Sequence, residues 1–294
     1  MSTLSDINPM KINRISPQSN KYLQIITTIA SCPEKLYFIG KLPDTRTPSV
    51  AIVGARKHTS YGKEVTYKIA YDLAKKGIII ISGMALGIDG IAHQAAIDAG
   101  GQTIAVLPCS VENIYPAAHH SLSRAILAQN GVIISEYEPG VLARDYQFLE
   151  RNRIVSGLAD AVIVTEAAIR SGTLSTVAHA LNQGKEVFVV PGNITSPMSA
   201  GCNQLIKQGA HPITCAEDVI SVIAPNLLTK QNKLPLGDNP LQSKIIKLLQ
   251  NGLRDGDEIL QQTNVAASNL SIELTMLEIS GIIRSLGGNQ WTLR

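Results

Sequence analysis

The sequence predicts an α/β protein with a doubly wound, mostly parallel sheet, followed by a smaller domain of different architecture. Short apolar segments rich in β-branched residues recur along residues 36–224, and segments with helical spacing separate them. Strands that alternate with helices of about 10–15 residues are typical of a parallel sheet with right-handed crossovers. We therefore expect a short N-terminal tail and helical stretch (1–35), an α/β domain (36–224), a linker containing Pro and Gly (225–240) and a C-terminal domain (241–294).

The predicted strands are apolar along their whole length, which indicates burial on both faces of the sheet. A sheet of this kind is Rossmann-like, and its ligands bind at the carboxyl ends of the strands. The expected helices are Ser60–Lys75, Ile88–Asp98, His119–Gln129 and Thr173–Asn182. The expected strands are Leu36–Ile39, Ser49–Val53, Ile78–Ile81, Thr103–Leu107, Val132–Ile134, Ala161–Thr165 and Val187–Val190.

The C-terminal domain has its own pattern. Leu241–Gln250, Gly256–Gln262 and Ala267–Gly281 have the spacing of three short helices. Ile282–Leu286 and Trp291–Leu293 form the expected arms of a hairpin. Three helices followed by a hairpin are the outline of a winged helix.

Composition restricts the class of protein. Of the 294 residues, 45% are hydrophobic and 17% are charged, so the chain is not intrinsically disordered. No apolar run reaches the roughly 18 residues that span a bilayer, and the first 30 residues contain no signal-peptide block. We expect a cytoplasmic protein without a membrane partner. The four cysteines form no CxxC pair, so we expect no disulfide framework, no metal and no cofactor.

Two loops after predicted strands have the features of anion-binding sites. Gly54-Ala55-Arg56 follows Val53, and Ser82-Gly83-Met84 follows Ile81 in a segment with three glycines. Bare main-chain N–H groups at a strand end, next to a helix start, suit a phosphate. The glycine spacing is not GxGxxG and no GxxxxGK[ST] occurs, so no motif for nucleotide hydrolysis is present.

Three further segments carry polar and basic residues toward the same edge. Arg170-Ser171-Gly172-Thr173 opens a predicted helix, and a polar run after Val190 leads to Lys207. Arg151-Asn152-Arg153 follows Phe148 and precedes an apolar helical turn. Pairing of these arginines with Glu150 or Asp160 is the structural alternative to ligand binding. Asp89 and Asp160 are expected to order loops or cap helices.

Assembled in order, these segments resemble the DNA-processing protein A family (DprA, also called Smf), from Leu36 to about Ile220. The resemblance rests on the following segments: Val53-Gly54-Ala55-Arg56, Ser82–Asp89, Thr103–Leu107, Tyr115-Pro116 with His120, Ser135–Gly140, Arg151–Leu158, Val189–Gly192 and Gly201–Ala210.

The resemblance implies a non-catalytic protein that binds single-stranded DNA, protects incoming DNA during natural transformation and loads a RecA-type recombinase onto it. It also implies a homodimer formed through the Rossmann-like domain. The matching residues imply a nucleic-acid pocket made of Gly54, Arg56, Ser82, Gly83, Arg151, Asn152, Arg153, Ser171, Gly172 and Lys207.

The sequence departs from the family pattern in three places. Only about 35 residues precede the sheet, Leu149 stands where the family usually has proline, and Val141–Tyr146 is not the usual proline-rich segment. The net charge is only +3, and three Phe, one Trp and eight Tyr are too few for an extended stacking platform. We therefore expect modest, salt-sensitive DNA affinity.

Two other functions stay open. One is a nucleotide-binding enzyme related to nucleoside-monophosphate phosphoribohydrolases, although no glutamate follows Thr176 before Glu186 in the loop where those enzymes carry one. The other is a protein-interaction module with a vestigial pocket. The third helix of the winged-helix domain has no Lys or Arg and carries Glu273 and Glu278. We expect this domain to contact protein rather than duplex DNA.

Overall fold

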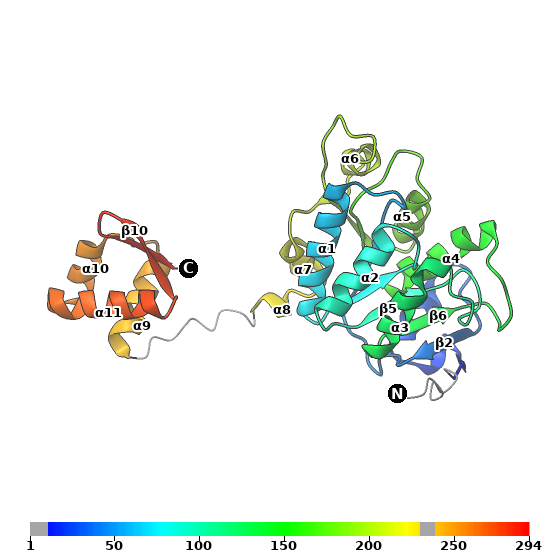
Figure 1. Cartoon of the computed structure of the whole chain (residues 1–294), viewed down its shortest axis with the longest axis horizontal. Coiled ribbons are helices and arrows are strands. Elements are labelled where there is room, and N and C mark those ends of the chain that lie inside the picture. Colours follow the sequence, from blue (N-terminus) through cyan, green and yellow to red (C-terminus); the bar gives the residue numbers. More distant parts are fainter. Residues whose placement is uncertain (1–10, 230–238, 294) are drawn as a thin grey trace, which may run out of the picture. The chain divides into compact units, whose positions relative to one another are not determined.

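The computed structural model describes residues 11–229 and 239–293, and the chain divides into two compact units between Leu228 and Thr229 (Figure 1). Most of the predicted linker, residues 230–238, and the first ten residues of the predicted tail lie outside the described residues. At the start of that linker, Asn226–Thr229 forms the short helix α8.

The first unit is built on a nine-stranded sheet with the order β1-β2-β6-β5-β4-β3-β7-β8-β9. From β3 to β9 all neighbours pair in parallel, whereas β1 and β2 are antiparallel at one edge. The strands are β1 (Asn13–Ile15), β2 (Leu36–Gly40), β3 (Ser49–Val53), β4 (Ile79–Ser82), β5 (Thr103–Val106), β6 (Val132–Ser135), β7 (Ala161–Val164), β8 (Glu186–Val189) and β9 (His211–Pro212).

The direction of winding reverses at β3. Successive strands from β3 to β6 are added on one side of β3, and β7, β8 and β9 are added on the other. In the register, Val53 lies opposite Val164 of β7 and Ala51 lies opposite Ile81 of β4. The topological switch point, where ligands of doubly wound sheets bind, is therefore the carboxyl end of β3 beside β7.

Helices cover both faces of the sheet and bury two apolar layers. On one face α1 (Ser60–Lys75), α2 (Ile88–Asp98) and α7 (Ala216–Ile223) pack on Val50, Ile52 and Ile80. On the other face α4 (Asp145–Leu158), α5 (Thr173–Asn182) and α6 (Ala200–Lys207) pack on Ala51, Val53 and Ile81. A third apolar cluster joins α3 (His120–Ala128) to the β5 and β6 end of the sheet. Because alternate residues of one strand enter opposite layers, the strands are apolar throughout, as the sequence predicts.

The described N-terminal residues are part of this unit: a segment of the expected tail pairs with the sheet, and a short helical stretch follows it. Asn13–Ile15 pairs with β2 as an edge strand, although its residues have no strand-like apolar pattern. Leu23–Thr28 forms a 3-10 helix whose Leu23 and Ile26 are fully buried in the layer under α4. Tyr22 is also buried, and its hydroxyl lies 2.8 Å from Ser49 Oγ at the start of β3.

The second unit is a winged helix with its own core, which confirms the predicted fold class. Its helices are α9 (Pro240–Gln250), α10 (Gly256–Thr263) and α11 (Ala267–Ile279), and its hairpin is β10 (Ile283–Gly287) with β11 (Gln290–Leu293). Side chains of Asn239 and Asp255 cap the first two helices. The core joins all three helices and the hairpin through Ile246, Ile259, Leu277, Ile283 and their neighbours.

Helix α11 presents apolar and acidic side chains outward. Ile272, Met276 and Ile279 are each more than half exposed. Glu273 accepts hydrogen bonds from the side-chain amides of Asn239 and Gln242. A helix surface of this composition lacks the basic groups that a phosphate backbone requires.

Among the described residues, no helix is long and apolar enough to cross a membrane, and no group of three or more His, Cys, Asp or Glu residues is arranged to hold a metal ion. All four cysteines, which belong to the described part of the chain, are free thiols.

Candidate nucleic-acid interface

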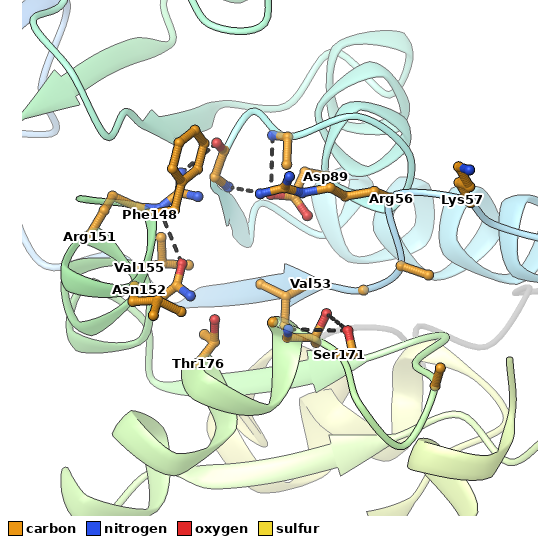
Figure 2. A pocket seen from close by; sticks show the side chains of 18 of the residues that line it. Val53, Arg56, Lys57, Asp89, Phe148, Arg151, Asn152, Val155, Ser171 and Thr176 are labelled. Atoms are coloured by element: carbon orange, nitrogen blue, oxygen red, sulfur yellow. Dashed lines mark hydrogen bonds between the residues drawn. The ribbon is translucent and has the colours of Figure 1, made fainter. Parts of the chain in front are cut away.

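A cavity of about 390 Å³ lies at the carboxyl ends of β3, β4 and β7, at the topological switch point (Figure 2). The loops after these three strands form most of its wall, and residues Phe148–Val155 of α4 close one side. The site is where a doubly wound sheet positions a ligand. Its wall combines main-chain loops, basic side chains and one aromatic ring.

The loop after β3 brings Arg56 to the cavity. A Cβ atom on Gly54 would lie 2.7 Å from Ile88 Cγ1 of α2, so the close approach of loop and helix requires glycine. The Ala55 amide then donates to the Glu166 carbonyl oxygen at 2.8 Å, which fixes the turn against the end of β7. Arg56 and Lys57 follow with exposed side chains.

Arg56 is held in place by an aromatic ring rather than by a carboxylate. Its guanidinium carbon lies 5.3 Å from the centre of the Phe148 ring, and both side chains face the cavity in Figure 2. A cation over an aromatic face is attracted to it without being neutralised. Arg56, Lys57 and Arg170 form no ion pair with any residue that the structure describes. These three cations are therefore available to an anion.

The loop after β4 is held by the buried side chain of Arg151. Its Nη1 donates to the carbonyl oxygens of Gly83 and Val106. A Cβ atom on Gly83 would lie 2.3 Å from that nitrogen, so a larger residue would displace the arginine. On the other side of the loop, Asp89 Oδ2 accepts hydrogen bonds from the amides of Gly83 (3.0 Å) and Ala85 (3.3 Å) (Figure 2). Asp89 thus orders the loop, as predicted.

Burial shifts the pKa values of both Arg151 and Asp89. Desolvation lowers the pKa of Arg151 to about 10; Asp89 opposes this shift and Arg56 adds to it. Desolvation also raises the pKa of the Asp89 carboxyl, against the effect of Arg151 and of the two main-chain amides. Arg151 remains a cation at neutral pH, because its pKa still lies well above 7. Arg151 is 4% exposed, so its positive charge acts on the cavity through the electrostatic field more than through direct contact with a ligand.

The loop after β7 leads into the N-terminus of α5. Ser171 Oγ accepts from the Thr173 amide at 3.2 Å, and Arg170 and Gly172 are exposed beside it. The next two amides, of Leu174 and Ser175, donate to the carbonyl oxygens of Ser171 and Gly172, so this helix end favours an anion through its partial positive charge and not through free amides. Nearby, Asn152 Oδ1 accepts from Arg151 Nε at 3.2 Å. The cavity therefore has a second wall that suits a phosphate, opposite Arg56.

The structure brings most of the predicted site residues together. Three of them do not line the cavity: Ser82, Arg153 and Lys207. Those that line it are Gly54, Arg56, Gly83, Arg151, Asn152, Ser171 and Gly172.

The structure shows why each of these three residues lies outside the cavity wall. Ser82 is fully buried, and its hydroxyl donates to the Ile52 carbonyl at 2.6 Å. Arg153 forms a two-point ion pair with Glu136, at 2.8 and 2.6 Å, and not with Glu150 or Asp160 as the structural alternative proposed. Lys207 is the last residue of α6, about 10 Å along the helix from its start near the cavity.

Other lining residues are absent from the predicted site. Lys57, Arg170 and Met198 are the main examples. Both cations adjoin predicted site residues in the sequence, so their position at a strand end was the available signal. Met198 belongs to a polar segment without a periodic hydrophobic pattern, so the sequence contains no signal for its position. Leu149 also lines the cavity.

Fold and cavity together define a class: a doubly wound α/β protein with an anion-receptive site at its switch point and a separate winged-helix domain. Residues 13–224 match the family of DNA recombination-mediator protein A, and residues 230–289 match the DprA winged helix domain. The chain belongs to the DNA recombination-mediator protein A family, whose members are named DprA or Smf.

Individual relatives agree with this assignment. The chain is 38% identical to the DNA processing protein DprA of Bacillus subtilis over 209 residues, which cover 71% of this chain and 70% of the relative. It resembles the crystal structure of DprA from Streptococcus pneumoniae with a TM-score of 0.67 and 36% identity, over 72% of this chain and 75% of that one. A structure reported for the single-stranded DNA binding mode of DprA from Helicobacter pylori matches with a TM-score of 0.65 and 35% identity, over 74% and 98%.

Proposed function

We propose that this chain binds single-stranded DNA at the switch-point cavity and loads a RecA-type recombinase onto it during DNA uptake and recombination. The observation that carries the proposal is the set of cations without carboxylate partners, Arg56, Lys57 and Arg170, around a cavity with main-chain loops. The related Helicobacter pylori protein, described by its single-stranded DNA binding mode, supports the choice of ligand.

The strand backbone binds between two walls. One phosphate contacts Arg56, and the same or a neighbouring phosphate faces the N-terminus of α5 beside Ser171. The Phe148 ring lies under Arg56 and is half-buried, which leaves an aromatic surface for one base. Because phosphate contacts dominate this arrangement, affinity falls as salt rises.

A hydrolase related to phosphoribohydrolases is the weaker alternative. Among the described residues that line the cavity, Asp89 is the one carboxylate, and its Oδ2 is engaged by two amides. Glu166, the glutamate nearest to the loop after β7, is 1% exposed and accepts hydrogen bonds from the amide and hydroxyl of Thr59. It does not line the cavity. This arrangement favours binding over glycosidic cleavage.

The homodimer that the family resemblance implies has a candidate surface in the α/β unit. An apolar groove of about 250 Å³ runs between α5 and α6, and Ile169 and Leu181 on its rim are 56% and 62% exposed. Two copies joined there engage one strand at two cavities and gain affinity by multivalency. Leu181→Glu should give a monomer by light scattering, whereas Val222→Glu on α7, which covers the opposite face of the sheet, should not. A dimer that persists in Leu181→Glu excludes this groove.

Recombinase loading is tested on single-stranded DNA coated with a single-strand-binding protein. We place this protein in the cytoplasm, where it would meet coated strands of this kind. The assay measures how long the coating delays the start of ATP hydrolysis by the RecA-type recombinase. We expect the chain to shorten that delay, and Arg56→Ala to lose the effect. An unchanged delay in the presence of a chain that binds the strand would remove the loading step from the proposal.

A further inference from the structure

A second cavity, of about 270 Å³, lies in the same unit as the switch-point cavity. It is formed by the loop after β5, by the start of α3 and by the segment before α4. Residues on its wall include Glu112, Ile114, Tyr115, His120 and Leu142. Pockets for drug-sized molecules span roughly 300–1,000 Å³, so this one suits a smaller group such as a single flat ring system.

An aromatic pair connects the two cavities. Phe148 lines the switch-point cavity and Tyr115 lines the second one. Their ring centres are 5.3 Å apart at an interplanar angle of 71°, an edge-to-face contact. Tyr115 is 46% exposed, so its ring offers a surface to one base beside the switch-point cavity. Aromatic side chains are the usual support for successive bases of single-stranded DNA.

The chemistry of the second cavity differs from that of the first. Lys and Arg do not occur among the described residues that line it, and Glu112 contributes a carboxylate, so a phosphate would be repelled. Ile114, Leu142 and Ala143 supply apolar surface. The Cys109 thiol donates to the Asn113 carbonyl at 2.9 Å, and burial raises its pKa to about 11, so it is a packing group and not a nucleophile. These features exclude the DNA backbone and suit a base.

Glu112 gives the cavity a hydrogen-bonding preference. Its Oε1 accepts from the Gly140 amide at 2.6 Å, which holds the carboxylate in place. Its Oε2 has no hydrogen bond with any residue in the described part of the chain and can accept one. Cytosine N4 and adenine N6 are exocyclic amino groups that donate hydrogen bonds, whereas thymine has none and carries an acceptor, O4, in the same place. Thymine can still donate from N3–H, but this group lies between the acceptors O2 and O4, so a carboxylate binds cytosine and adenine more favourably than thymine.

We propose that this second cavity binds the base of a nucleotide next to the one whose phosphate contacts Arg56. Tyr115 stacks on that base, and Glu112 selects an exocyclic amino group, so cytosine and adenine are preferred over thymine. This inference rests on the proposed single-strand binding, because the base enters the cavity only when the neighbouring phosphate is held.

The test compares oligonucleotides of deoxycytidine and of thymidine of equal length by fluorescence anisotropy. We expect the wild-type chain to bind the deoxycytidine strand about tenfold more tightly. Glu112→Gln should abolish this preference while it leaves the thymidine affinity the same or higher, since an amide can donate to O4. Glu34→Gln, which removes one exposed carboxylate outside both cavities, is the matched control and should keep the preference.

A second pair of variants separates stacking from folding. Tyr115→Ala should weaken binding of the deoxycytidine strand about tenfold, and Tyr115→Phe, which keeps the ring, should restore most of it. Equal affinity for both strands, with unchanged affinities in Glu112→Gln and Tyr115→Ala while Arg56→Ala still weakens binding, would overturn the base site and leave the proposed function intact. Absence of binding to either strand by the wild-type chain would instead overturn the proposed function.

Discussion

Replacement of Arg56 by alanine removes the cation on which the proposed DNA site most depends. The arginine is exposed, lies 5.3 Å from the Phe148 ring centre and has no carboxylate partner among the described residues. No ion pair must therefore break before it binds a phosphate. A hydrogen bond to a charged group contributes about 1.5–3 kcal/mol. Because water competes at an exposed site, we expect the lower part of that range, about 1.5–2 kcal/mol, or a roughly 10- to 30-fold rise in Kd.

The measurement is anisotropy of a labelled single-stranded oligonucleotide across a series of salt concentrations. Loss of one phosphate contact should also reduce the slope of log K against log salt by about 0.7. Arg124→Ala, which removes an exposed arginine on α3 away from both cavities, is the control and should change neither quantity. A folded Arg56→Ala protein with the wild-type Kd and slope would show that Arg56 does not bind DNA.

Three further predictions follow from side chains outside the cavity wall or outside the α/β unit. Arg153→Ala breaks the ion pair with Glu136 and should lower the free energy of unfolding, measured in urea, by about 1–3 kcal/mol. The same variant should leave the salt slope of DNA binding unchanged. A changed slope would place Arg153 at the DNA. Burial, with smaller effects of His119 and Arg151, lowers the pKa of His93 to about 3, so the unfolded chain takes up the proton first and stability should fall as pH drops from about 6.5 toward 3. His93→Gln should flatten that fall, and an equal slope would assign it to other groups. The isolated winged-helix unit, residues 229–294, should not shift duplex DNA in a gel at moderate salt, and a clear shift would contradict the reading of α11.

The parts of the fold with a strong period were predictable from the sequence. Helices α1, α2 and α5 have the predicted bounds, because their buried residues recur at helical spacing. Helix α4 was not predicted as a whole, since Gln147 and Arg151 occupy buried positions and interrupt its apolar pattern. Strand β1 has three residues, and its pairing with β2 decides its conformation more than its own composition does.

The candidate site was predictable where it depends on strand ends. The loops after β3, β4 and β7 meet at one edge because the strands are parallel neighbours, so Gly54, Gly83 and Ser171 converge. The role of an arginine depends instead on partners far away in the sequence. Arg151 bonds to carbonyl oxygens 68 and 45 residues away, and no local pattern reveals them. The same limit applies to Arg153. Its ion-pair partner, Glu136, is 17 residues away in the sequence, so the local pattern predicts a free cation at the pocket.

The most direct test of the account is the affinity of the whole chain for a labelled single-stranded oligonucleotide and for its duplex, at two salt concentrations. The cavity, with its exposed cations and its adjoining aromatic pair, predicts tighter binding of the single strand and a steep loss of affinity at the higher salt. Equal binding of strand and duplex, or no binding of either, would contradict the assignment of the switch-point cavity to single-stranded DNA.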